Sequence, residues 1–144
     1  MRFFAGSDIV FGSGSIQQLP ELLKPWNGQK VMIVSDPGVT AAGIAGRVQR
    51  ILEEGGLQTR LFSEVKANPT NENVNRAAQL ARDYAPDLFV AVGGGSSIDL
   101  TKAVSLLMTN PDPIEAYGGI GNVPKKGLPL AAVPTTSGTS SEIT

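Results

Sequence analysis

Residues 88–99 of the chain read LFVAVGGGSSID, and this stretch decides the fold that we expect. Its first five residues are apolar without interruption, which is typical of a β-strand buried on both faces of a sheet. Three glycines follow, and a helix is predicted after them, with Ser96 or Ser97 as its cap and Asp99 in its first turn. The sequence therefore predicts a buried strand, a tight turn and a helix in direct succession.

The glycine turn also indicates a phosphate-binding site. The first backbone N–H groups of a helix have no partner within it, and the positive end of the helix dipole attracts anions. Because Gly94 and Gly95 carry no side chain, a diphosphate can lie directly against the backbone. Glycines also occur in such turns for structural reasons alone. The spacing matches neither G-x-G-x-x-G, since Ile98 stands at the third glycine, nor the P-loop.

Further apolar runs predict the other strands of a sheet. They lie at residues 31–34, 58–62 and 130–133. Between the strands, apolar residues recur at helical spacing over residues 41–52 and 74–84, which predicts amphipathic helices. Because continuous apolar strands alternate with helices, the sequence predicts an α/β fold, a Rossmann-like parallel sheet with helices on both faces.

Local signals mark the start of the chain and of one helix. Thr70 or Asn71 is expected to cap the helix over residues 74–84. Near the N-terminus, the segments 2–4 and 9–11 predict a short β hairpin. Ser15 is expected to cap a short helix after this hairpin.

The composition limits what the chain can do. It has 144 residues, 41% of them hydrophobic and 17% charged, which suits one ordered globular domain. A net charge of −1 argues against nucleic acid as a partner, and no apolar run is long enough to span a membrane. The first residues do not form a signal peptide, and we expect a cytoplasmic location.

Two residue types are missing altogether. The chain contains no histidine and no cysteine. Their absence excludes Ser-His-Asp and Cys-His catalysis and argues against a zinc or iron site within this chain. The sequence also stops where a further element begins, so we expect it to be a fragment of a longer protein.

Asp36 follows the first core strand and is a candidate ligand-binding residue. A carboxylate at the carboxyl end of such a strand can accept hydrogen bonds from both ribose hydroxyls of an adenosine. It would repel a 2′-phosphate, so NAD is expected rather than NADP. The sequence Asp36-Pro37-Gly38 is equally suited to a plain turn, and position alone does not separate the two interpretations.

Two other segments follow predicted strands. Residues 134–142, PTTSGTSSE, are rich in hydroxyl groups that can bind a polar ligand or cap a helix. We expect this loop to face the same crevice as the glycine turn. Asn68 is held extended by the proline after it, so its amide either points at a ligand or caps the next helix.

In this order, these segments resemble the N-terminal half of the iron-containing (group III, metal-dependent) alcohol dehydrogenases. The resemblance rests on residues 8–14, 35–36, 68–70, 93–99 with Lys102, and 134–142. It implies that residues 1–144 are an NAD-binding α/β domain and that an all-helical domain outside this chain holds iron or zinc. It also implies that no metal ligand and no catalytic residue lies in this chain, and that the full-length protein is a homodimer or a higher homo-oligomer.

The resemblance also implies a set of cofactor-binding residues. They are Asp36, Asn68, Gly94, Gly95, Ser96, Asp99, Thr135, Thr136, Thr139 and Thr144. The full-length protein would pass a hydride between a small alcohol or aldehyde and the nicotinamide of NAD, and this fragment alone is expected to be inactive. Two alternatives remain. One is a relative similar to the glycerol dehydrogenases or dehydroquinate synthases, and the other is a stand-alone nucleotide-binding module without catalysis.

Overall fold

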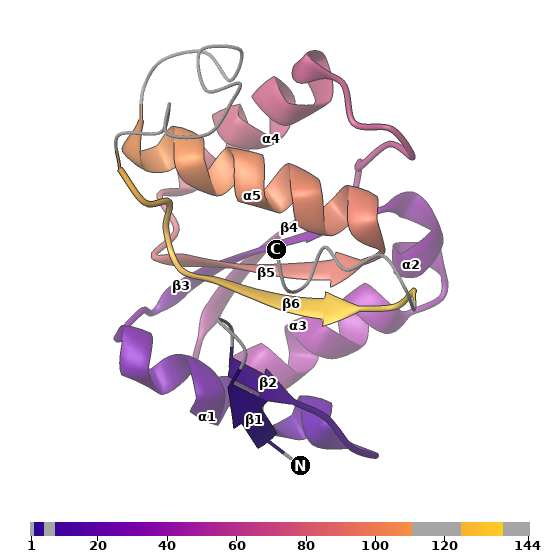
Figure 1. Ribbon diagram of the computed structural model, residues 1–144, viewed down its shortest axis with the longest axis vertical. Coiled ribbons are helices and arrows are strands. Elements are labelled where there is room, and N and C mark those ends of the chain that lie inside the picture. The colour runs from indigo at the N-terminus through magenta and orange to yellow at the C-terminus, as the bar shows by residue number, and fades with distance from the viewer. Residues whose placement is uncertain (1, 5–7, 111–124, 137–144) are drawn as a thin grey trace.

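The protein is described here by a computed structural model, which covers residues 2–4, 8–110 and 125–136. Four strands form one parallel sheet in the order β4-β3-β5-β6 (Figure 1). Their bounds are Lys30–Ser35 for β3, Gln58–Phe62 for β4, Leu88–Gly93 for β5 and Leu130–Pro134 for β6. All four predicted strands are confirmed. Since they are parallel, all end at one side of the molecule, which we call the carboxyl end of the sheet, opposite its amino end.

Helices cover both faces of the sheet, as predicted (Figure 1). On one face lie α1 (Leu19–Leu23) and α3 (Ile44–Glu54). The other face carries α4 (Asn71–Tyr84) and α5 (Gly95–Thr109). Strand β3 shows why both faces are covered. Its residues Val31 and Ile33 pack in the apolar cluster of α1 and α3, whereas Met32 and Val34 pack in the cluster of α4 and α5.

The N-terminal hairpin is confirmed as a separate two-stranded antiparallel sheet of β1 (Arg2–Phe4) and β2 (Asp8–Val10). Its second strand begins one residue earlier than predicted. The prediction that Ser15 caps the next helix is wrong. The short 3-10 helix η1 (Ser15–Gln18) begins after Gly14, which adopts a left-handed φ of 74° and offers no side-chain cap.

The helix predicted over residues 41–52 is in fact two helices. Helix α2 (Pro37–Ala41) comes first, and Gly43 with a φ of 83° separates it from α3. A left-handed residue cannot continue a right-handed helix, so the apolar spacing persists across a break in the backbone. A second 3-10 helix, η2 (Lys24–Trp26), leads into β3. Thr70 caps α4 as predicted, because its Oγ1 accepts a hydrogen bond from the Asn73 amide.

Two parts of the expected site lie outside the described residues. The hydroxyl-rich segment is described as far as Thr136, and the predicted cofactor-binding residues Thr139 and Thr144 lie outside the described residues. In the described ranges, no helix has the length and apolar character needed to cross a membrane.

Candidate functional site

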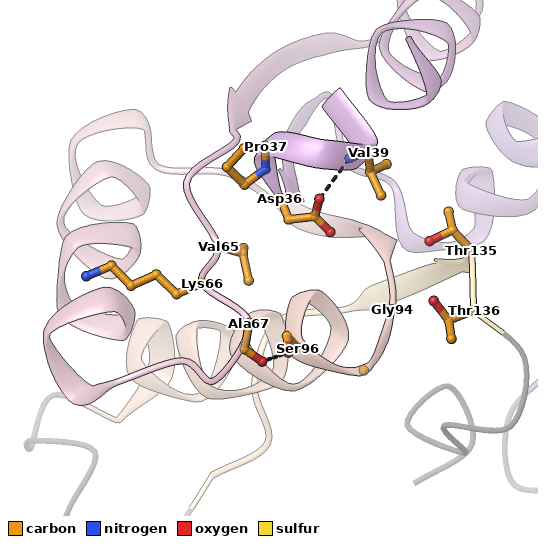
Figure 2. Close-up of a pocket in the computed structure, with 11 residues that line it drawn as sticks. Asp36, Pro37, Val39, Val65, Lys66, Ala67, Gly94, Ser96, Thr135 and Thr136 are labelled. Carbon is orange, nitrogen blue, oxygen red and sulfur yellow. Dashed lines mark hydrogen bonds between the residues drawn. The ribbon is translucent and has the colours of Figure 1, made fainter. Parts of the chain in front are cut away.

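A pocket of about 460 Å³ opens at the carboxyl end of the sheet (Figure 2). Segments that follow all four strands line it. The lining residues are Asp36, Pro37 and Val39 after β3; Val65, Lys66 and Ala67 after β4; Gly94, Gly95 and Ser96 after β5; and Thr135 and Thr136 after β6. The volume is typical of a small-molecule site. Its place outside the carboxyl ends of parallel strands is where open α/β sheets bind ligands.

The turn after β5 has two successive glycines, of which the first is required by its backbone and the second leaves room for a ligand. Gly93 has a φ of 151°, and a Cβ there would lie 2.6 Å from Ser97 Oγ. A Cβ on Gly94 would lie 3.0 Å from Thr136 Oγ1. A side chain at Gly93 would press on the start of α5, and one at Gly94 would fill the space between the segments after β5 and β6. The turn therefore presents bare backbone to the pocket.

The start of α5 differs from the prediction in two respects. Its cap residue is Gly94, which makes no side-chain bond, and Asp99 lies beyond the first turn. Neither predicted serine cap is present, because the Ser96 hydroxyl donates to the carbonyl of Ala67 instead. Ser97 is fully buried, and its Oγ has no hydrogen-bond partner in the described part of the chain.

Two backbone N–H groups at the start of α5 have no partner among the described residues and can bind a ligand. No hydrogen bond among the described residues uses the amides of Gly95 or Ser96. Both residues line the pocket, and α5 extends over 15 residues behind them. Free N–H groups and the positive end of the helix dipole thus meet at the pocket surface, which is the arrangement that binds phosphate.

Asp36 combines the two roles that the sequence left open. Its Oδ1 accepts a hydrogen bond from the Val39 amide at 2.8 Å, which caps α2. Its other carboxylate oxygen faces the open centre of the pocket (Figure 2). One oxygen therefore stabilises the local turn, and the other can accept a hydrogen bond from a ligand.

Thr135 and Thr136 lie across the pocket from Asp36. The Thr135 amide donates to the Gly93 carbonyl at 2.9 Å, which fixes the segment after β6 to the glycine turn. Both threonine hydroxyls are on the pocket side (Figure 2). The described start of the hydroxyl-rich segment, Thr135 and Thr136, thus faces the same crevice as the glycine turn, as predicted.

Asn68 and Asp99 are not among the residues that line this pocket. Both side chains are exposed. Their role with a cofactor stays a prediction. The sequence analysis missed Val65, Lys66 and Ala67, which form the wall after β4. The only available signal was their position after a strand that ends at the same side as Asp36. Lys66 lies on this wall, but its side chain points away from the pocket centre (Figure 2).

The residues present do not fit a catalytic metal. The chain has no histidine and no cysteine. Over the described ranges, no three acidic residues come close enough together to hold a metal ion. The chemistry of this pocket is therefore that of binding an anionic, polar ligand through backbone amides, one carboxylate and hydroxyl groups.

Comparison with known sequences identifies relatives over nearly the whole chain. The family model for iron-containing alcohol dehydrogenases matches residues 6–144. Alcohol dehydrogenase 4 of Saccharomyces cerevisiae is 39% identical over 134 residues, which are 93% of this chain and 35% of the yeast protein. The chain thus spans about a third of the length of this curated relative.

Solved structures agree with the sequence comparison. A 1,3-propanediol oxidoreductase matches 92% of this chain and 35% of its own, with a TM-score of 0.87 and 32% identity. A sulfoacetaldehyde reductase from Bifidobacterium kashiwanohense, solved in complex with NAD+, matches 93% of this chain and 35% of its own, with a TM-score of 0.83 and 31% identity. Sequence, fold and pocket agree, and the chain belongs to the family of iron-containing alcohol dehydrogenases.

Proposed function

We propose that this chain is the NAD-binding domain of a metal-dependent alcohol dehydrogenase and that NAD binds in the pocket at the carboxyl end of the sheet. One observation carries the proposal. The bare backbone of Gly94 and Gly95 opens into the pocket at the positive end of α5, with the Asp36 carboxylate on the opposite wall. A diphosphate and a ribose within one molecule match these two features.

Each part of the pocket has a role in holding the dinucleotide. The amides of Gly95 and Ser96 would bind the diphosphate, since no described residue accepts a hydrogen bond from them. The free oxygen of Asp36 would accept hydrogen bonds from the adenosine ribose. Its charge would repel the 2′-phosphate of NADP, so NAD is preferred. The hydroxyls of Thr135 and Thr136 would bind the cofactor from the wall after β6.

The chemistry requires more than this chain provides. NAD, when bound, accepts or donates a hydride at its nicotinamide. The residues of this chain bind and orient it. An all-helical domain outside this chain would hold iron or zinc and most of the pocket for a small alcohol or aldehyde. The proposal includes that the full-length protein forms a homodimer or a larger homo-oligomer and is located in the cytoplasm. The 144-residue chain alone is expected to show no dehydrogenase turnover.

Titration calorimetry with four ligands tests the proposal. NAD and ADP-ribose should bind to the chain, and NADP should bind more weakly because of the Asp36 charge. A preference for ATP, or no binding of any of the four, would contradict it and favour a stand-alone nucleotide module or a structural domain. Oxidation of ethanol by this chain without any partner would contradict the placement of the metal in another domain.

A further inference from the structure

The pocket wall after β4 has no regular secondary structure. Residues 64–67 connect β4 with the loop before α4 and belong to neither a strand nor a helix. Three of them, Val65, Lys66 and Ala67, line the pocket. The position of such a segment depends on the bonds that it makes with its neighbours. The question is which residue holds this wall in place.

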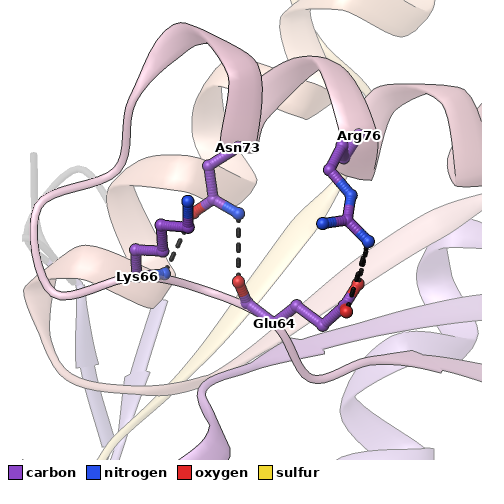
Figure 3. A network of polar contacts seen from close by, with 4 residues as sticks. All are labelled: Glu64, Lys66, Asn73 and Arg76. Carbon is purple, nitrogen blue, oxygen red and sulfur yellow. Dashed lines mark hydrogen bonds and ion pairs between the residues drawn. The ribbon is translucent and has the colours of Figure 1, made fainter.

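The side chain of Asn73 binds the wall from behind (Figure 3). Its Oδ1 accepts a hydrogen bond from the Lys66 amide at 3.0 Å. Its Nδ2 donates to the Glu64 carbonyl at 3.0 Å. These are the two backbone groups on either side of Val65. Asn73 is only 2% exposed and does not line the pocket. Its side chain therefore affects the pocket through the wall and does not contact a ligand there itself.

Further hydrogen bonds fix the position of Asn73 and attach other points of the wall. The Asn73 amide donates to Thr70 Oγ1, which caps α4, so the side chain projects from a fixed helix start. The Val65 amide donates to the Ser35 carbonyl at 3.3 Å, and Ala67 accepts from the Ser96 hydroxyl. The wall is thereby attached to α4, to β3 and to the start of α5.

We infer that Asn73 is a positioning residue for the dinucleotide, an inference that rests on the proposed function. By holding the backbone of Glu64 and Lys66, Asn73 sets the distance between this wall and the start of α5, and hence the width of the pocket. Removing its carboxamide leaves a partly buried N–H and C=O without partners. The wall then moves, and the pocket no longer matches the cofactor.

The same helix offers a matched control, Arg76. Its guanidinium bonds to the carboxylate of Glu64 at 3.1 and 3.3 Å (Figure 3). Both side chains are more than half exposed, at 59% and 57%. Arg76 therefore touches the same wall residue as Asn73, but it holds a solvent-exposed side chain instead of the backbone. Exposed ion pairs contribute little, so the wall should keep its position without it.

The test compares NAD binding by the unsubstituted chain with Asn73→Ala and Arg76→Ala, by calorimetry at a temperature where each is folded by circular dichroism. We expect the Kd of Asn73→Ala to rise about tenfold and that of Arg76→Ala to change less than about twofold. Hydrogen exchange at the Lys66 amide should be faster in Asn73→Ala only. A purely structural role would lower the melting temperature and leave the Kd unchanged.

If Asn73→Ala does not fold, the Kd of Asn73→Asp for NAD tests the inference instead. It keeps the shape and the acceptor for the Lys66 amide but loses the donor to the Glu64 carbonyl, and its Kd should rise at least about threefold. A folded Asn73 variant with the Kd of the unsubstituted chain overturns the inference, as does an equal rise in Arg76→Ala. Failure of the unsubstituted chain to bind NAD overturns the proposed function itself, and the inference with it.

Discussion

The polar groups at the two ends of the parallel sheet differ in whether they are hydrogen-bonded within the protein. At the amino end, the polar groups form hydrogen bonds with one another. Asp87 accepts hydrogen bonds from the amides of Gln29 and Lys30 at 2.8 and 2.9 Å, and the Lys30 ammonium donates to the Tyr84 carbonyl at 2.5 Å. The same ammonium lies 4.5 Å from the centre of the Tyr84 ring. These polar groups at the amino end therefore already have partners within the protein.

At the carboxyl end, comparable groups remain open to the pocket. One oxygen of Asp36 and the amides of Gly95 and Ser96 form no hydrogen bond within the described part of the chain. Such groups add nothing to the stability of the fold, yet they are available to a ligand. The amino end thus uses its polar groups within the fold, whereas the carboxyl end leaves them open to the pocket in which we propose that NAD binds. Each prediction below tests one side of this division.

The largest effect is expected for Gly94→Ala at the carboxyl end. The new methyl group would lie 3.0 Å from Thr136 Oγ1 and on the surface where the diphosphate should rest. The φ of Gly94 is −87°, so alanine brings no backbone strain and the fold should be unaffected. We expect the Kd for NAD to rise at least about thirtyfold, as measured by calorimetry.

Gly46→Ala is the matched control for this substitution. Nothing lies within 4 Å of a Cβ at this position of α3. The Kd for NAD should stay unchanged, and the free energy of unfolding should rise by up to about 1 kcal/mol because alanine favours a helix. Normal binding by Gly94→Ala would contradict the assignment of the glycine turn to the diphosphate.

Gly28→Ala tests the amino end and should have the reverse profile. A Cβ there would lie 2.6 Å from Leu88 Cδ2, and Leu88 is completely buried. The clash should lower the free energy of unfolding by about 2 kcal/mol in a urea titration. The Kd for NAD of the folded chain should not change. If Gly28→Ala lost NAD affinity while its free energy of unfolding stayed unchanged, the proposed difference between the two ends of the sheet would be wrong.

Asp36→Asn should change the choice of cofactor. The asparagine oxygen can still cap α2 through the Val39 amide, so the fold is kept. The negative charge that faces the pocket is removed. We expect the ratio of the Kd for NADP to the Kd for NAD to fall about tenfold in calorimetric titrations. An unchanged ratio would show that Asp36 acts only as a helix cap.

The smallest effect concerns acid stability at the amino end. Hydrogen bonds from the Gln29 and Lys30 amides hold the pKa of Asp87 below its ordinary value of 3.8. The folded state thus binds this proton less readily than the unfolded state does. The resulting stability is fully present above about pH 4 and is lost as the pH falls through the lowered pKa.

Urea titrations at pH 5 and pH 3 measure this contribution. Asp87→Asn should reduce the difference in unfolding free energy between the two pH values, by less than about 1 kcal/mol because the carboxylate is exposed. An identical pH dependence in the variant would exclude Asp87 as its source.

The sheet could be predicted from the sequence because its strands are continuous apolar runs. Strand β5 is buried at every position from Leu88 to Gly93, and its continuous apolar sequence predicted a strand that is covered on both faces. The break at Gly43 was not predictable in the same way. The apolar spacing on both sides of it stays in phase, and only the left-handed backbone at this glycine separates α2 from α3.

The pocket was predictable where it depends on strand ends and not where it depends on distant contacts. Asp36, Gly94 and Thr135 follow apolar runs, so their common location followed from the parallel sheet. The hydroxyl of Ser96 was expected to cap its own helix, but it bonds to Ala67, 29 residues away in sequence. No local pattern reveals such a partner. The wall after β4 follows a strand end, but its residues carry none of the side-chain patterns that mark a binding site.

Nuclear magnetic resonance of the ¹⁵N-labelled chain during an NAD titration tests the central claim most directly, because it observes both ends of the sheet at once. The account predicts that the amide resonances of Gly94, Gly95 and Ser96 move along one saturating curve. Those of Gln29 and Lys30 should stay in place. Shifts confined to the amino end, or unmoved glycine amides at saturating NAD, would contradict it.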